Sequence, residues 1–263
     1  MSKLACTNVR PMRKFGEEGC RIRELYLKKY ANMTLSKNAS LRSKWLPPRH
    51  VSLTLEDVLS RLGALVDQSD PDFTLSNKVH AFQAAEEARR LFPDDEGMHL
   101  TALIHDLGKI MSCWSEDQAY VVGDTYPLAR PIHPSLPYSD SFNQLDATVN
   151  YPVGCGLREV EMTWGHDEYL YSILRNCGCT LPEVYLDIIR FHSFYAWHTH
   201  GGYVELESSY DREVLQPAIA RFNRCDLYSK SNGMLTHKEC NSLWEDYYHP
   251  LAVKYGLGGK ILW

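Results

Sequence analysis

The stretch MHLTALIHDLGKIMSCW at residues 98–114 decides the fold class of this chain. Its apolar residues recur at helical spacing, and the ones that we expect to face inward are Leu103, Ile104, Leu107, Ile110 and Met111. Each residue of a helix advances about 100° around the axis, so the adjacent polar residues His105 and Asp106 can both face one interior. The pattern predicts a helix that presents a histidine and a carboxylate on its buried side.

Helical periodicity with turn punctuation continues on both sides of this stretch. Thr54 and Asp57 resemble a capping box, and Pro182 and Pro217 stand near first helical positions. We expect further helices at 20–31, 54–66, 80–92, 157–175, 182–194, 217–230 and 238–255. Sustained strand alternation does not occur, so the sequence predicts an all-α fold in a single domain spanning 1–263, with 1–50 as an N-terminal covering segment.

One long segment departs from this pattern. Residues 121–152 contain five prolines and little periodicity. A loop of this length in a compact domain is usually a binding loop or a lid. We therefore expect a long lid-like loop at 121–152.

Composition excludes several classes of protein. The 263 residues carry a formal net charge of -5, which argues against nucleic acid or an anionic membrane as the main partner. Residues 1–10 contain no apolar signal core, and no apolar run is long enough to span a bilayer. The eight cysteines form no CxxC pair, as expected of reduced thiols. We expect a cytoplasmic protein.

The candidate metal ligands lie in or at the ends of the expected helices: His80, His105, Asp106, His166, His192 and Asp226. Six N/O donors exceed what one metal usually takes from protein, and a shared carboxylate would allow two metals side by side. Imidazole with carboxylate suits iron, manganese or zinc. The set predicts a dinuclear centre for oxygen chemistry or metal-assisted hydrolysis.

Each of these residues also has an ordinary structural interpretation. A single buried histidine is more often a hydrogen-bonded core residue than a ligand, and Asp226 with Lys230 could be a surface ion pair at i,i+4. The apolar neighbours Phe222, Cys225 and Leu227 favour burial of Asp226. Lys109 could contact a substrate or could be a solvated lysine. Only the joint occurrence of the six donors favours a metal centre.

The motifs together resemble a known family. The pattern made by His80, His105-Asp106 and Asp226 resembles the HD-domain superfamily, and the added pair His166 and His192 resembles its mixed-valent di-iron oxygenase branch. From about Arg13 to Trp263 the chain is similar to the myo-inositol oxygenase family. The strings that carry this resemblance are LVDQSDPD at 65–72, HAFQAAE at 80–86, HDLGK at 105–109, VVGDT at 121–125, WGHDEY at 164–169, RFHSFYAWHT at 190–199 and CDLYSK at 225–230.

The resemblance implies an HD-domain-like helical bundle around two iron ions, Fe(II)/Fe(III), in each chain. It implies that one iron is held by His80, His105, Asp106 and Asp226, and the other by Asp106, His166 and His192. It implies that Lys109 and Asp106 act in catalysis. The implied substrate-binding positions are Arg13, Asp67, Lys109, Gly123, Asp124, Ser193 and Lys230.

The implied reaction is the O2-dependent, four-electron ring cleavage of myo-inositol to D-glucuronate, by a protein that we expect to be a monomer. Three alternatives stay open. One is an HD-type metal-dependent phosphohydrolase, which would need basic residues for phosphate. Another is a related di-iron oxygenase acting on another polyol or on a phosphonate. The third is a helical protein that binds a metal or a partner without catalysis.

Overall fold

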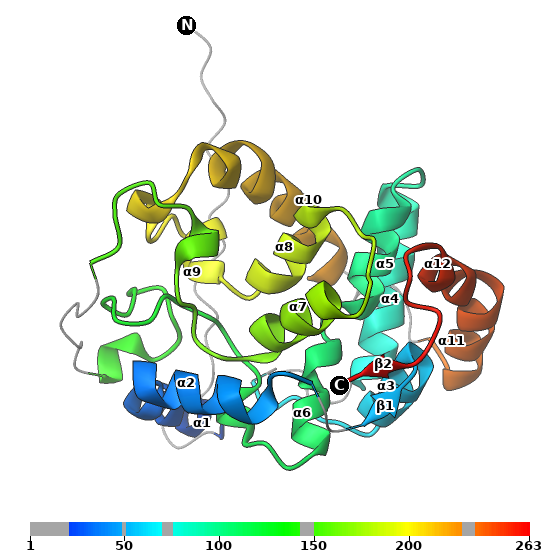
Figure 1. The fold of residues 1–263 in the computed structure, drawn as a ribbon, viewed down its shortest axis with the longest axis horizontal. Helices are drawn as coiled ribbons and strands as arrows, with labels where there is room; N and C mark the ends of the chain where they lie inside the picture. Colours follow the sequence, from blue (N-terminus) through cyan, green and yellow to red (C-terminus); the bar gives the residue numbers. More distant parts are fainter. Residues whose placement is uncertain (1–20, 49–50, 70–75, 143–149, 228–234) are drawn as a thin grey trace, which may run out of the picture.

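The computed structural model describes residues 21–48, 51–69, 76–142, 150–227 and 235–263. Its centre is a set of packed helices formed by α4 (Asn77–Leu91), α5 (Glu96–Ile104), α7 (His166–Asn176), α8 (Glu183–Phe191) and α10 (Gln216–Asp226). Helix α4 packs along α5, α7 packs along α8, and α10 contacts α4, α5 and α8 (Figure 1). The inner ends of these helices therefore meet in one interior.

Shorter elements cover this centre. They are α1 (Arg21–Asn32), α2 (Leu35–Trp45), α3 (Leu55–Leu62), α6 (Ile110–Cys113), α9 (Tyr195–His198), α11 (His237–Leu243) and α12 (His249–Lys254). 3-10 turns occupy Leu107–Lys109, Gln118–Tyr120, Ser139–Ser141, Leu157–Glu159 and Val204–Leu206, and π-helical turns occupy Asp211–Leu215 and Trp244–Tyr248. In Figure 1, α1 and α2 lie on the opposite side of the centre from α11 and α12.

The fold class predicted from the sequence is confirmed. Apart from β1 (Ser52–Leu53) and β2 (Ile261–Leu262), which form a two-stranded antiparallel sheet, the regular structure of the described residues is helical. The capping box of Thr54 and Asp57 is present at the start of α3.

The expectation of one helix over 98–114 is wrong. Helix α5 ends at Ile104, Asp106 leaves helical geometry at φ -96 and ψ 0, and a 3-10 turn precedes α6. Packing explains the break, because a Cβ at Gly108 would come within 2.1 Å of the His166 carbonyl oxygen. The chain tightens here so that the start of α7 can approach it, and this brings His166 beside the His105-Asp106 pair.

Two other expectations also differ from the structure. The helix expected over 157–175 begins only at His166, because Leu128 and Thr163 donate backbone hydrogen bonds to Glu161 and Tyr126, which ties 161–163 to the loop at 126–128. No helix was expected between residues 31 and 54, but Leu35–Trp45 form α2, whose start is capped by the Thr34 side chain.

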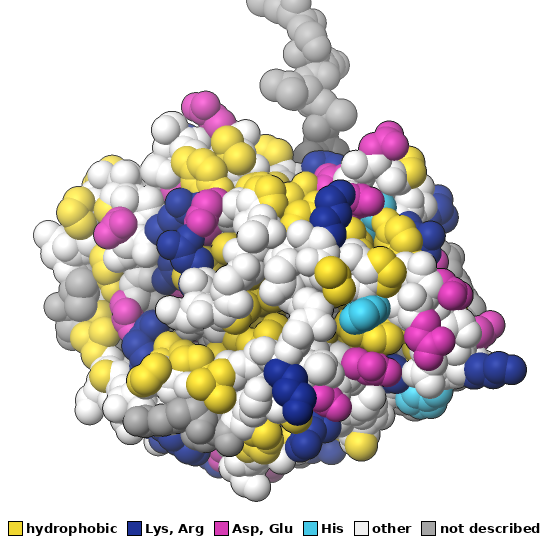
Figure 2. Space-filling model, turned by 45° about the vertical axis from the view of Figure 1, so that its right-hand side comes forward, with side chains coloured by type: hydrophobic (Ala, Val, Ile, Leu, Met, Phe, Trp, Pro, Cys, Tyr) yellow, Lys and Arg dark blue, Asp and Glu magenta, His cyan; other side chains and the backbone are white. Residues whose placement is uncertain are grey.

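The face drawn in Figure 2 carries charged side chains of both signs. On the face drawn in Figure 2, Lys and Arg side chains lie among Asp, Glu and hydrophobic side chains rather than in one basic patch. Within the described part of the chain, no helix combines the length and apolarity needed to cross a membrane.

Candidate metal centre

All six candidate ligands come together at the inner ends of the central helices. His80 projects from α4, His105 and Asp106 follow the end of α5, and His166 begins α7. The last two candidates, His192 and Asp226, stand at the ends of α8 and α10. Five of the six are buried, and the His80 side chain is only 14% exposed.

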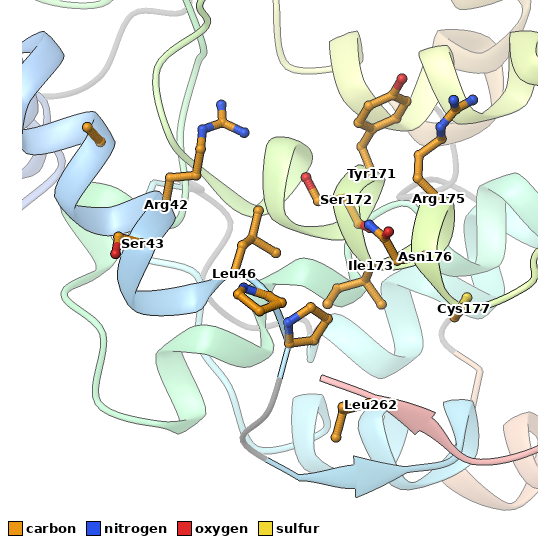
Figure 3. Close-up of a pocket in the computed structure, with 13 residues that line it drawn as sticks. Arg42, Ser43, Leu46, Tyr171, Ser172, Ile173, Arg175, Asn176, Cys177 and Leu262 are labelled. Carbon is orange, nitrogen blue, oxygen red and sulfur yellow. The ribbon is translucent and has the colours of Figure 1, made fainter.

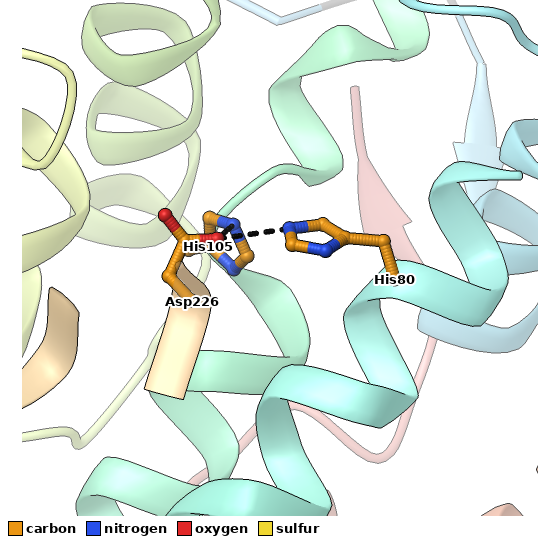
Figure 4. A group of neighbouring side chains, drawn as sticks. All are labelled: His80, His105 and Asp226. Carbon is orange, nitrogen blue, oxygen red and sulfur yellow. Dashed lines mark ion pairs between the residues drawn. The ribbon is translucent and has the colours of Figure 1, made fainter. Parts of the chain in front are cut away.

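The first group of donors is His80, His105 and Asp226. Oδ1 of Asp226 lies 2.9 Å from Nε2 of His80 and 3.5 Å from Nε2 of His105. Figure 4 shows both imidazoles pointing toward this carboxylate from different helices. Donors bound to one metal at about 2.1 Å lie about 3 Å apart when their bonds are perpendicular, so this spacing suits one shared cation.

The second group contains His166 and His192. Their Nε2 atoms lie 3.3 Å apart, a distance that also suits two ligands of one metal. A third buried donor, Asp167, places Oδ1 2.7 Å from Nε2 of His166 and 3.6 Å from Nε2 of His192.

Asp106 lies between the two groups. Its Oδ2 atom is 3.3 Å from Nε2 of His105 and 3.8 Å from Nε2 of His80. Its Oδ1 atom is 3.3 Å from Nε2 of His166 and 3.7 Å from Nε2 of His192. One carboxylate therefore presents a different oxygen to each group of histidines.

Backbone hydrogen bonds orient three of the imidazoles. Nδ1 of His105 lies 2.9 Å from the carbonyl oxygen of Ala102, and Nδ1 of His192 lies 2.9 Å from that of Ile189. Nδ1 of His166 lies 2.7 Å from the carbonyl oxygen of Val121. An imidazole that donates from Nδ1 keeps the Nε2 lone pair for a metal, and each of these Nε2 atoms faces the cluster.

The buried carboxylates of the cluster stabilise positive charge on the groups beside them. Although burial would raise it, Lys109 and His105 hold the pKa of Asp106 well below its usual range, and His105 and His80 do the same for the pKa of Asp226. Burial acts to lower the pKa of His105, but Asp106 and Asp226 outweigh burial and raise this pKa to about 10. Asp167 and Asp106 likewise raise the pKa of His166 to about 9. Cations can replace the protons that the histidines would otherwise hold.

One orphaned atom supports the fit of a metal ion to this donor set. Oδ2 of Asp167 is buried without a hydrogen-bond partner among the described residues. Buried polar atoms, above all those of a carboxylate, are normally paired. Buried carboxylates in excess of fixed cations, with imidazole nitrogens facing them, are donor chemistry that suits a bound metal ion.

Asp167 is a residue that the sequence reasoning missed. The signal was available, because His166-Asp167 repeats the dipeptide His105-Asp106. Its carboxylate also accepts a hydrogen bond of 3.3 Å from the hydroxyl of Ser193. It links Ser193, an expected substrate contact, to the second group of histidines.

Lys109 is buried beside the cluster, so its interpretation as an ordinary solvated lysine is wrong. Its Nζ atom lies 2.8 Å from Oδ2 of Asp106 and 2.7 Å from Oδ2 of Asp67. Burial would lower its pKa, but the two carboxylates outweigh burial and raise it. Lys109 therefore remains an ammonium ion that faces the candidate centre.

The other expected substrate positions divide into two sets. Gly123 and Asp124 lie in a turn with φ of +81° at Gly123, and the Asp124 carboxylate accepts a 2.8 Å hydrogen bond from Tyr26. The backbone of Thr125 donates to the carbonyl oxygen of Ser193, which connects this turn to the end of α8. Arg13 and Lys230 lie outside the described residues.

Two surface hollows lie elsewhere. A groove of about 990 Å³ runs between α2 and α7 and is lined by residues that include Arg42, Leu46, Tyr171 and Ile173 (Figure 3). A smaller hollow of about 660 Å³ lies between Asp95 and Tyr255. Neither is lined by a candidate metal ligand, so neither belongs to the centre.

The fold and the site define a helical protein whose bundle interior gathers histidines and aspartates into a candidate metal centre. The family model of myo-inositol oxygenase matches residues 19–263. The inositol oxygenase of Danio rerio is 38% identical over 253 residues, which cover 92% of this chain and 89% of the relative. That of Mus musculus is 41% identical over 221 residues, covering 80% and 75%. A probable inositol oxygenase of Oryza sativa subsp. japonica is 35% identical over 254 residues, covering 92% and 80%. The chain belongs to the myo-inositol oxygenase family.

Proposed function

We propose that this chain is an inositol oxygenase that uses two irons and O2 to cleave the ring of myo-inositol to D-glucuronate. Membership of the family, with relatives named inositol oxygenase in animals and plants, supports the activity. The observation that carries the dinuclear part is the division of the Asp106 oxygens between His105 on one side and His166 on the other.

The proposed ligands are His80, His105, Asp106 and Asp226 for one iron, and Asp106, His166 and His192 for the other. When bound, the irons would supply Lewis-acid chemistry that lowers the pKa of a substrate hydroxyl, together with redox chemistry toward O2. The protein fixes this donor set before substrate arrives, because backbone carbonyls already orient three of the imidazoles.

Lys109 has an electrostatic role in this proposal. Because Asp106 and Asp67 raise its pKa, the ammonium keeps its proton at Nζ and does not act as a base. A fixed positive charge in a buried site stabilises negative charge that develops on a substrate oxygen. Asp67 also ion-pairs with this ammonium, at 2.7 Å from Nζ, and so helps to hold it in place.

The remaining proposed contacts are Arg13, Asp67, Gly123, Asp124, Ser193 and Lys230, which would sort the hydroxyl groups of the substrate. A polyol has no charge, so it must be recognised by many directed hydrogen bonds. Asp124 already accepts a hydrogen bond from Tyr26, which fixes the orientation of its carboxylate.

The open alternatives are less well supported. An HD-type phosphohydrolase, or a related oxygenase acting on a phosphonate, should offer several free cations to its anionic substrate. Among the described residues, the lysine that ion-pairs within the cluster is Lys109, and a single ammonium falls short of the several cations that such a substrate needs.

The proposal is tested by supplying iron-loaded protein with myo-inositol in air and under argon, and by measuring D-glucuronate. We expect product in air only, and greatly reduced product from His166→Ala in air. Release of phosphate from an inositol phosphate, without oxidation of myo-inositol, would support the hydrolase instead.

A further inference from the structure

Lys29 on α1 is a fully buried lysine to which the proposed reaction gives no role. Its ammonium donates to three backbone carbonyl oxygens, those of Val122 at 3.2 Å, Gly123 at 3.4 Å and Asp124 at 2.8 Å. Burial lowers its pKa to about 8, against the charges of nearby carboxylates. Because an ammonium has three donors, its whole hydrogen-bonding capacity goes to one turn of the chain.

Tyr26, one helical turn before Lys29, holds the same turn. Its hydroxyl donates to Oδ1 of Asp124 at 2.8 Å and accepts from the Asp124 backbone N–H at 3.1 Å. It also packs closely over Gly123, where an added Cβ would lie 3.2 Å from the hydroxyl oxygen. The two α1 side chains therefore fix the backbone of residues 122–124 and the carboxylate of Asp124.

The turn is attached to the candidate centre at both ends. The carbonyl oxygen of Val121 accepts from the backbone N–H of His166 at 2.9 Å and lies 2.7 Å from its Nδ1 atom. The backbone N–H of Thr125 donates to the carbonyl oxygen of Ser193 at 3.0 Å. Segment 121–125 thus joins α1 to the start of α7, where His166 lies, and to the end of α8, where His192 lies.

The carbonyl contacts also determine where a donor points. The C=O of Val122 and the N–H of Gly123 belong to one peptide unit, and in a trans peptide these two bonds point in opposite directions. The Val122–Gly123 bond is not among the cis bonds of the described chain. Holding the carbonyl on Lys29 therefore aims the Gly123 N–H away from α1.

We propose that Lys29 and Tyr26 are positioning residues that hold turn 122–124 in the shape that binds the polyol. In this arrangement α1 fixes the direction of the Gly123 N–H and of the Asp124 carboxylate. The inference rests on the proposed function, because it takes these two groups as substrate contacts. It means that helix α1 contributes to substrate affinity and does not contribute to metal binding.

The test compares Lys29→Met and Tyr26→Phe with a matched control. Methionine keeps the length of the side chain but cannot donate, and phenylalanine removes only the hydroxyl. The control is Lys28→Met, which alters the neighbouring lysine, a half-exposed side chain paired with Asp117. For each iron-loaded protein, iron content, KM and kcat for myo-inositol, and hydrogen exchange of amides 121–125 are measured.

We expect Lys29→Met to raise KM by roughly tenfold or more, because it removes charge-assisted hydrogen bonds. Tyr26→Phe should raise KM severalfold. In both variants kcat should change less than KM, iron content should stay at the wild-type value, and amides 121–125 should exchange faster. Lys28→Met should match wild type in all four measurements.

An unchanged KM in both variants would overturn the inference, and so would loss of iron in proportion to loss of activity. If Lys29→Met does not fold, Tyr26→Phe decides alone by the same two criteria. Failure of the proposed function is seen separately, as wild-type protein that does not oxidise myo-inositol. In that case unchanged exchange at 121–125 in Lys29→Met would still refute the anchoring role.

Discussion

Oδ1 of Asp106 lies 3.3 Å from Nε2 of His166, although the whole segment from α6 to the start of α7 separates them in the chain. The contact depends on the break after α5 and on Gly108, which lets α7 approach. It brings His166 and His192 close to the Asp106 carboxylate, which also faces His80 and His105.

Metal content is the first prediction from this contact. We expect close to two irons per chain, and His166→Ala should lower this to about one, because the His80, His105 and Asp226 group stays intact. Metal analysis of the purified variants measures the change. One tightly bound zinc and no iron in the wild-type protein would contradict the dinuclear centre.

Removal of Lys109 should separate chemistry from metal binding. Lys109→Ala should keep its iron but lose kcat/KM by about 10²–10³, as is usual for removal of a group that stabilises developing charge. Lys254→Met, which changes an exposed lysine on α12, serves as the control and should behave like wild type. Equal loss of iron and activity in Lys109→Ala would mean that the lysine is structural.

Metal binding should release protons. The pKa of His105 is raised to about 10 and that of His166 to about 9, so both imidazoles hold protons at pH 7 in metal-free protein. Metal must displace these protons, and its affinity should therefore rise as pH rises from 7 toward 9. Calorimetric titration in buffers of different ionisation enthalpy measures the release. Heats and affinities that are independent of buffer and pH would contradict it.

Lys29 should make stability depend on pH in the opposite direction from an ordinary ion-paired lysine. Its pKa falls from 10.5 to about 8 on folding, so the unfolded chain binds more protons between these values. The free energy of unfolding should then rise with pH from about 8 to 10.5, by at most about 1.4 kcal/mol per pH unit.

Comparison with Lys29→Met isolates this effect from other titrating groups. In denaturant titrations of iron-loaded protein, the free energy of unfolding of wild type minus that of the variant should increase with pH over that window. The free energy of unfolding of Lys28→Met should change with pH as that of wild type does. A gap that is constant from pH 8 to 10.5 would show that Lys29 titrates normally.

The sequence predicted the helical class and the six candidate ligands because both depend on local patterns. Periodicity marks helices wherever apolar residues face a core, and histidines with aspartates at helix ends stand out against apolar neighbours. The break at Asp106 could not be predicted in this way, because it results from contact between Gly108 and the distant His166.

The roles of Lys29 and Asp167 were missed for different reasons. Lys29 continues the inward face of Ile22, Leu25 and Tyr26 on α1, but a lysine at such a position is usually read as solvated. Its function depends on carbonyl groups far along the chain, which no local pattern reveals. Asp167 carried a visible signal in the repeated His-Asp dipeptide.

The most direct test of the proposed reaction is the ratio of O2 consumed to D-glucuronate formed. Conversion of myo-inositol to D-glucuronate removes four electrons from the substrate, and O2 accepts four. With iron-loaded protein and no added reductant, an oxygen electrode combined with product analysis should give a ratio near one. D-glucuronate formed at full rate under strict anaerobiosis, or phosphate released from a phosphorylated inositol in its place, would contradict the account.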